Sequence, residues 1–383
     1  MMLHFTKQEL ARRRRAACRE MAKLSLDGLL IFRQESMYYL TGYDTSGYSM
    51  FQGMYLGADG ALALCTRSAD LRQARLTSVI KDVRIWRDRE GANPADDLRD
   101  MLDSYRCRGK RLGVESHAYG LTAQRGQMVD AALHGFCRTE DASDLVRLLR
   151  LVKSPAELVY VRGAGQLADE ALAVANRLTV PGARVGEIYG EMQKVILAGD
   201  GDPSASRWPM GRGEEALLVR YHTGHGTVGR TDQVTFEFAA AYRHYHAALM
   251  HVTLTGKVDR RHRDMFAACA EALDAAQTML RPGRTVGEVF DAHARTLKKA
   301  GYEGHYLNAC GYTMGATYPP TWMDWPMVYT GNPQILSPGM VFFLHMIVLN
   351  SRTGLSMCLG ETSIVTPRGC EAVTRAPRQL VVN

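Results

Sequence analysis

The sequence predicts two domains, an α/β domain followed by an α+β domain, and three observations support this. From Gly28 to Asp144 short apolar stretches alternate with helical ones, which is typical of an α/β domain with a mixed or largely parallel sheet. A helix break at 153–157 then interrupts the helical spacing. Beyond the break, helical periodicity and Pro-Gly turns delimit two successive α-α-β-β blocks. The chain has 383 residues, 46% of them apolar and 23% charged, so it is long enough to bury two ordinary globular cores.

The first domain contains five apolar stretches that predict its strands. They are GLLIF at 28–32, MYYLTGY at 37–43, ALALCT at 61–66, VRIW at 83–86 and RLGVE at 111–115. Its boundary follows from KSPAE, because Ser154 is suited to cap a helix and Pro155 to occupy its first turn. One helix therefore ends near Val152 and another begins there, which predicts domains at 1–150 and 151–383.

The second domain contains four stretches of helical spacing and three groups of strands. The expected helices are 168–178, 185–197, 263–280 and 286–300. The expected strands are a pair around Glu237, the run MVFFLHMIVL at 340–349, and 360–365. One block is therefore centred on Glu237 and the other on the two strands that contain His345 and Glu361.

Composition excludes several classes of protein. The formal charge is +7, but the basic run Arg12–Arg15 comes without a nucleic-acid motif or interleaved aromatic residues, so we interpret it as a solvated helix face. The eight cysteines lie far apart without a CxxC pair, which favours reduced thiols. No secretory leader is apparent, and the longest apolar stretch is short and interrupted by His345. We expect a soluble, cytoplasmic protein without nucleic-acid or membrane partners.

The segment TFEFAAAYRHYHAALMHVT, residues 235–253, is the strongest indication of chemistry. Glu237 stands between two phenylalanines on an expected strand, where burial raises a carboxyl pKa or a cationic ligand matches its charge. His222 and His225 precede this strand in YHTGHG, and an imidazole there is suited to exchange protons near neutral pH. Strand alternation predicts that His244 and His246 share one side of their strand. We expect these two and His251 to be structural or exposed.

This segment resembles the creatinase/prolidase superfamily, the pita-bread enzymes. There, an Asp on each of two neighbouring strands, the His of a GHxxG phrase and two late Glu residues bind two metal ions. The corresponding positions here are Glu237, Ala248, Tyr312, His345 and Glu361. The resemblance implies a pita-bread catalytic domain in which Glu361 approaches Glu237. An alanine and a phenol are unsuited to a tight two-metal site, so we expect no metal and no cofactor, with a cationic substrate between the two carboxylates.

A second resemblance is narrower. The phrase GYTMGATYPPTW at 311–322 resembles the ectoine hydrolase subfamily, as do YLTGYD at 39–44 and PRQLVV at 377–382. It implies a metal-independent homodimer that opens a small cyclic amidine, with Glu237 as nucleophile or base. The expected catalytic residues are Glu237, Glu361, His222, His225 and Tyr312, and the expected substrate-binding residues are His345, Tyr43, Tyr48, Tyr318 and Trp322.

Two alternatives stay open at this point. One is a Xaa-Pro peptidase with a rebuilt single-metal site of Glu237, His345 and Glu361, and the other is a non-catalytic binder of a cationic solute. The sequence does not decide between His222 and His225 as the catalytic histidine, nor does it name the substrate.

Overall fold

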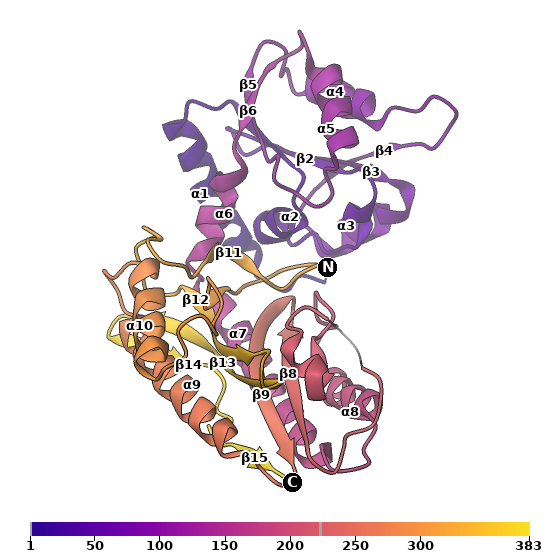
Figure 1. Cartoon of the computed structure of the whole chain (residues 1–383). Helices are drawn as coiled ribbons and strands as arrows, with labels where there is room; N and C mark the ends of the chain where they lie inside the picture. Colours follow the sequence, from indigo (N-terminus) through magenta and orange to yellow (C-terminus); the bar gives the residue numbers. More distant parts are fainter. Residues whose placement is uncertain (1, 222–223) are drawn as a thin grey trace. The chain divides into compact units, whose positions relative to one another are not determined.

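The computed structural model describes residues 2–221 and 224–383, which divide into two compact units, Met1–Arg150 and Leu151–Asn383 (Figure 1). Within the described residues, no helix is long and apolar enough to cross a bilayer.

The first unit is built on a six-stranded mixed sheet of order β4-β3-β2-β1-β5-β6. Neighbours β1/β5, β5/β6 and β3/β4 are parallel, and β1/β2 and β2/β3 are antiparallel. Leu29 and Ile31 belong to one hydrophobic cluster and Leu30 and Phe32 to another, because alternate residues of β1 point to opposite faces. The strands are β1 (Gly28–Ile31), β2 (Gly53–Gly57), β3 (Leu62–Arg67), β4 (Asp82–Trp86), β5 (Arg111–Val114) and β6 (Arg138–Asp141). The helices are α1 (Lys7–Lys23), α2 (Gln34–Thr41), α3 (Leu71–Thr77), α4 (Pro94–Ser104), α5 (Ala123–Leu133) and α6 (Ser143–Leu151), with short 3-10 turns η1 (Gly47–Ser49) and η2 (Ser68–Asp70).

One predicted strand of this unit is wrong. The stretch 37–43 lies largely in α2, which Gly42 terminates in the left-handed conformation with φ 82°. All eight residues of α2 are buried, the polar Gln34, Glu35 and Ser36 among them, so no apolar stripe marks one face of the helix. Periodicity does not separate a short buried helix from a buried strand. No strand was predicted at β2 or β6, which complete the sheet.

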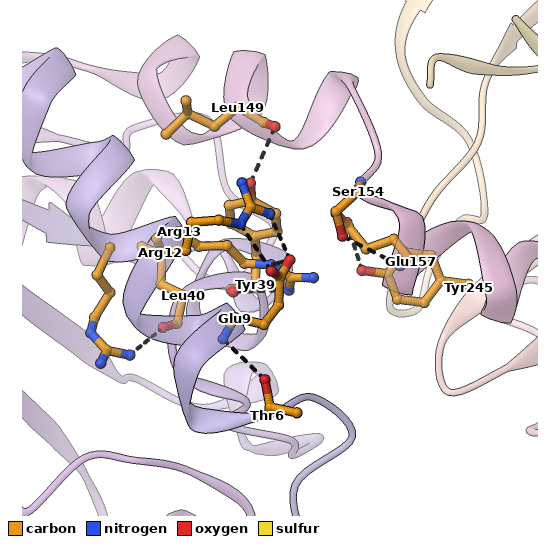
Figure 2. Close-up of polar contacts among 11 residues, drawn as sticks. Thr6, Glu9, Arg12, Arg13, Tyr39, Leu40, Leu149, Ser154, Glu157 and Tyr245 are labelled. Carbon is orange, nitrogen blue, oxygen red and sulfur yellow. Dashed lines mark hydrogen bonds and ion pairs between the residues drawn. The ribbon is translucent and has the colours of Figure 1, made fainter. Parts of the chain in front are cut away.

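The basic run of α1 is only partly a solvated face, because Arg13 is fully buried. Figure 2 shows Arg13 beside Glu9, whose carboxylate also accepts from Arg12. The Arg13 guanidinium lies 4.0 Å from the ring centroid of Phe5 and 4.5 Å from that of Tyr39. A carboxylate and two aromatic faces therefore compensate the buried cation.

The second unit contains a nine-stranded sheet in which β11-β10-β12-β13-β9-β8-β7 are neighbours in that order, while β14 pairs with β13 and β15 with β9. All of these pairs are antiparallel except β15/β9. The strands are β7 (Met210–Arg212), β8 (Asp232–Tyr242), β9 (Tyr245–Thr255), β10 (Gly311–Thr313), β11 (Asp324–Met327), β12 (Val341–Asn350), β13 (Leu355–Thr366), β14 (Gly369–Ala372) and β15 (Val381–Val382). The helices are α7 (Pro155–Leu178), α8 (Val185–Ala198), α9 (Arg260–Met279) and α10 (Val286–Lys299), with a 3-10 turn η3 (Gly213–Leu217).

The predicted helix start at the head of this unit is confirmed. Ser154 and Glu157 form a reciprocal capping box, and Pro155 occupies the first turn of α7. Glu157 also accepts a hydrogen bond of 2.8 Å from the hydroxyl of Tyr245, which ties the start of α7 to the start of β9 (Figure 2). Local capping chemistry and tertiary contact therefore specify the same helix start.

The two predicted blocks are confirmed as two halves of one curled antiparallel sheet, the pita-bread arrangement. The first half comprises α7, α8, β8 and β9, and the second comprises α9, α10 and β10 to β13, with α7 against β8 and β9 and α9 against β12 and β13 (Figure 1). The halves meet where β9 pairs with β13, and we call this ladder the seam. The candidate site crosses it.

Candidate active site

Four positions lie in one row across the sheet, and the row defines the face on which the site is built. Glu237 of β8 pairs with Met250 of β9, Met250 with Gly360 of β13, and Gly360 with His345 of β12. Directly paired residues of antiparallel strands point to the same face. Glu237 and His345 therefore share one face, although they come from different halves.

Tyr312 joins this face from the neighbouring strand β10. It pairs with Phe343, which stands two residues from His345 and so points the same way. The ring of Tyr312 lies 5.5 Å from that of Phe343 and 5.8 Å from that of His345. Its hydroxyl donates to Oε1 of Glu237 at 3.5 Å, a long hydrogen bond between the two halves.

A second donor stands behind the phenol. Nε1 of Trp322 donates to the Tyr312 oxygen at 2.7 Å, and both side chains are buried. The indole proton therefore holds the phenol oxygen in place, so that the phenol proton is directed at the carboxylate. This Trp322–Tyr312–Glu237 series is a short relay of hydrogen bonds ending on an acidic group.

The electrostatics of the relay suit proton exchange. Burial raises the pKa of Glu237 to about 7, while the charge of Arg220 and the hydrogen bond from Tyr312 act in the opposite direction. Burial, and next the Glu237 carboxylate, raise the pKa of Tyr312 well above its usual range. At neutral pH the phenol therefore keeps its proton, whereas the carboxyl group exists in both of its forms.

His345 contributes a neutral imidazole to the same face. It is buried, and burial lowers its pKa to about 3. Its Nδ1 atom has no hydrogen-bond partner among the residues that the structure describes. A buried, unbonded ring nitrogen next to Tyr312 is suited to a polar group of a bound ligand.

The expectation that Glu361 approaches Glu237 is wrong. Glu361 pairs with Leu249, one residue along from the Glu237 row, and so points to the opposite face of the sheet. There it accepts hydrogen bonds from Arg378 at 2.5 and 2.8 Å and from Gln277 at 3.1 Å. The residue of β13 on the face of Glu237 is Gly360, which has no side chain.

These positions do not fit a pair of metal ions. On the face of the row, the aligned positions provide the carboxylate of Glu237, the neutral ring of His345, the phenol of Tyr312 and a methyl group at Ala248. A Cβ atom at Gly360 would lie 2.8 Å from Cζ of Phe343, because that ring fills the space. In residues 2–221 and 224–383, no cluster of three His, Cys, Asp or Glu ligand atoms includes Glu237. The single-metal alternative of Glu237, His345 and Glu361 fails as well, since Glu361 lies on the other face.

Of the two loop histidines, the structure describes only His225. His222 lies outside the described residues. His225 is exposed and lines a hollow of about 360 Å³ at the start of α8, together with Arg184, Glu187 and three glycines. No residue of the relay lines that hollow, so the structure adds no support for a catalytic role of His225.

The expected substrate-binding aromatic residues divide between the two units. In the first unit, Tyr43 is buried in a core cluster and donates to Gln52 at 3.3 Å, whereas Tyr48 is partly exposed and burial raises its pKa to about 12. In the second unit, Tyr318 is buried and stacks on His244 with ring centroids 4.4 Å apart. Of the expected residues, the structure brings together Glu237, Tyr312, Trp322 and His345.

The remaining histidines of this region are explained by packing. His244 lies in the β8–β9 turn with φ 66°, so strand alternation does not apply to it and that expectation is wrong. His246 is buried, and its Nε2 accepts the backbone N–H of Ala205 at 3.0 Å, as expected for a structural residue. His251 is also buried, but it pairs with Phe236 and therefore points away from the Glu237 face.

Sequence reasoning missed Arg220 and the partners of Glu361. Arg220 is an exposed residue whose charge acts on Glu237, Tyr312 and His345. It lies in irregular chain just before the YHTGHG phrase, where neither periodicity nor a motif identifies it.

Comparison with known proteins agrees with this fold. Residues 160–367 match metallopeptidase family M24, and residues 13–152 match the creatinase/prolidase N-terminal domain. An uncharacterized hydrolase/peptidase of Sinorhizobium fredii is 27% identical, with 100% of this chain and 99% of the relative covered. The ectoine hydrolase of Halomonas elongata is 26% identical, covering 99% of this chain and 98% of that protein. Among solved structures, a prolidase from Thermococcus sibiricus superposes with a TM-score of 0.87 at 17% identity, over 98% of this chain and 99% of the other.

Proposed function

Because this chain belongs to metallopeptidase family M24 but its ligand positions do not fit a metal pair, we propose that it is a metal-independent hydrolase. Its proposed substrate is a small cationic cyclic amidine of the ectoine type, in which it opens a ring C–N bond. The observation that carries the proposal is the Trp322–Tyr312–Glu237 relay, which ends on an acidic group with a pKa of about 7. The similarity to the ectoine hydrolase of Halomonas elongata supports the choice of substrate class.

The substrate charge complements the site. Glu237 has no carboxylate partner on its face of the row, and an amidinium ion would neutralise it on binding. That neutralisation favours the ionised form of Glu237 and so makes it available as a nucleophile or a base. In this proposal the unbonded Nδ1 of His345 hydrogen-bonds a polar group of the same ligand.

Two routes to ring opening use the same residues. As a nucleophile, Glu237 forms a C–O bond to the amidinium carbon, and a ring C–N bond breaks as Tyr312 gives its proton to the leaving nitrogen. Water then adds to that carbon and gives a proton back to Tyr312, displaces Glu237 and leaves an amide and a free amine. As a base, Glu237 removes a proton from water as the water oxygen bonds to the carbon. The ring C–N bond then breaks as Tyr312 gives its proton to the leaving nitrogen, and Glu237 returns the proton taken from water to Tyr312. In both routes one water molecule is consumed.

The decisive experiment is an NMR time course of chelator-treated protein with ectoine. We expect ring opening to acetylated diaminobutyrate at an unchanged rate after chelation, and none with Glu237→Gln. Acid quenching followed by mass spectrometry separates the routes, since only the nucleophile route leaves an adduct on Glu237. Activity that requires added metal, or tight binding without turnover, would replace this proposal with a peptidase-like or a non-catalytic function.

A further inference from the structure

The C-terminal segment 374–383, which we call the strap, is anchored to the first half of the sheet at both of its ends. The backbone N–H groups of Arg375 and Ala376 donate to Asp169 of α7 at 2.7 and 3.0 Å. Val381 and Val382 pair with β9. The side chain of Asn383 donates to two backbone oxygens, those of residues 176 and 179, at 2.7 Å each. Hydrogen bonds thus fix the strap to α7 and β9.

Between these anchors the strap contacts the second half through Arg378. Its Nε and Nη2 atoms donate to the two oxygens of Glu361 on β13 at 2.5 and 2.8 Å, and Nη2 also donates to Gln277 of α9 at 2.5 Å. Its Nη1 atom pairs with Asp274 on the same helix. Glu361 is only 5% exposed, so this bidentate pair is largely shielded from water.

The ladder that joins the two halves is short, although Gln233 of β8 also contacts Gly354 and Ser356, and Arg162 of α7 pairs with Glu371 of β14. The seam contains two residue pairs, Met250 with Gly360 and Leu249 with Glu361, whereas β8/β9 contains eleven and β12/β13 ten. Beyond these pairs, Oγ1 of Thr362 accepts from the nitrogen of Ala248 at 2.8 Å and donates to its oxygen at 2.9 Å. A side chain thus takes the place of a third ladder pair.

The seam lies in the middle of the candidate site. Met250 and Gly360 separate Glu237 from His345 within the row, and the Tyr312–Glu237 bond of 3.5 Å joins the halves. Because the ladder is short, a small rotation of one half relative to the other directly changes the distance between Tyr312 and Glu237. A displacement of about 1 Å at a reacting group costs on the order of a hundredfold in rate.

We infer that Arg378 is a positioning residue that holds the two halves at the angle which brings Tyr312 to Glu237. It acts from the opposite face, through Glu361 and the seam, and touches no substrate. Glu361 is then part of this positioning pair and not a catalytic acid. The kinetic part of the test rests on the proposed function, and the structural part does not.

The test compares Arg378→Met with Arg284→Met. Arg284 forms a pair of 2.8 Å with Glu288 within the second half alone, so its loss does not affect the seam. We expect Arg378→Met to lower kcat for ectoine by about tenfold or more with KM changed by less than about threefold, because geometry and not affinity is lost. Arg378→Lys should recover part of that loss, and Arg284→Met should resemble the wild type.

A substrate-free measurement keeps the inference separate from the proposed function. The indole N–H resonance of Trp322, assigned with Trp322→Phe, reports on the phenol that its proton reaches. We expect Arg378→Met to shift this resonance and Arg284→Met to leave it in place. Should Arg378→Met fail to fold, Glu361→Gln breaks the same pair without leaving a buried charge, and it should shift the resonance likewise. A folded variant with an unmoved resonance, or equal kcat in the two arginine variants, would overturn the inference.

Discussion

Glu237 and Glu361 point to opposite faces of the same sheet, one residue out of register with each other. The first ends a relay of hydrogen bonds from Trp322 and Tyr312, and the second is held by Arg378. Of these two carboxylates, therefore, only Glu237 faces the relay.

Activity should rise with pH through neutrality. Glu237 must be ionised to attack or to accept a proton, and its pKa is about 7 in the free protein. We expect kcat/KM to increase from pH 5.5 to 8 with a midpoint near that value, as a steady-state pH profile would show. Because the Tyr312 hydrogen bond lowers the pKa of Glu237, Tyr312→Phe should move the midpoint upward. A flat profile over this range would exclude Glu237 as the titrating group.

Glu237→Gln should abolish turnover and also stabilise the fold above neutral pH. The folded pKa of about 7 lies above the ordinary 4.5, so folding favours the protonated acid, and the contribution of Glu237 to stability falls as pH rises from 4.5 to 7. At pH 8 the raised pKa of Glu237 lowers the free energy of unfolding by roughly 3 kcal/mol, and a glutamine at this position does not lower it in this way. Urea unfolding at pH 8 and pH 4.5 checks this prediction. The variant should gain stability only at the higher pH, and an equal effect at both would contradict the linkage.

Removing a group of the relay should lower kcat more when that group contacts Glu237 directly than when it acts through Tyr312. Tyr312→Phe removes the proton donor, so we expect kcat to fall by about a hundredfold or more. Trp322→Phe removes only the hydrogen bond that orients the phenol, and about tenfold is expected. Tyr189→Phe is the matched control, because Tyr189 is a phenol of α8 that accepts from Gln193 and has no role in the relay. Larger losses for Trp322 than for Tyr312 would show that the phenol is not the donor.

In the first unit, Arg13 should be a determinant of stability. Arg13→Met deletes a buried cation held by Glu9 and two aromatic faces, and we expect the free energy of unfolding to fall by about 2–3 kcal/mol. Arg12 contacts the same carboxylate from the surface, with 52% of its side chain exposed, so Arg12→Met should cost less than about 1 kcal/mol. Equal destabilisation of the two variants in denaturant titrations would refute the difference.

Sequence reasoning succeeded where the signal is local. The capping residues Ser154 and Glu157 and the periodicity of the later helices specify their own conformations, so the start of α7 and the two blocks were predicted correctly. Glu237 was found from its place between two phenylalanines on an expected strand, and Tyr312 only from the resemblance to the creatinase/prolidase superfamily.

The failures concern information that no single segment contains. The side to which Glu361 points depends on the register of β13 against β9, and one residue of register reverses the face. Arg378 contacts Asp274 and Gln277 about a hundred positions earlier in the chain, and nothing local in PRQLVV indicates that. The helix α2 was missed because complete burial removes its periodicity.

The filled space above Gly360 also bears on how such a protein can change over evolutionary time. Placing a carboxylate there would drive its Cβ atom to 2.8 Å from the ring of Phe343 and 3.0 Å from the backbone oxygen of Leu344. An acidic residue at 360 would therefore need a smaller residue at 343 as well. Since the first change alone creates a clash and the second alone a cavity, either order of the two mutations passes through a less stable protein.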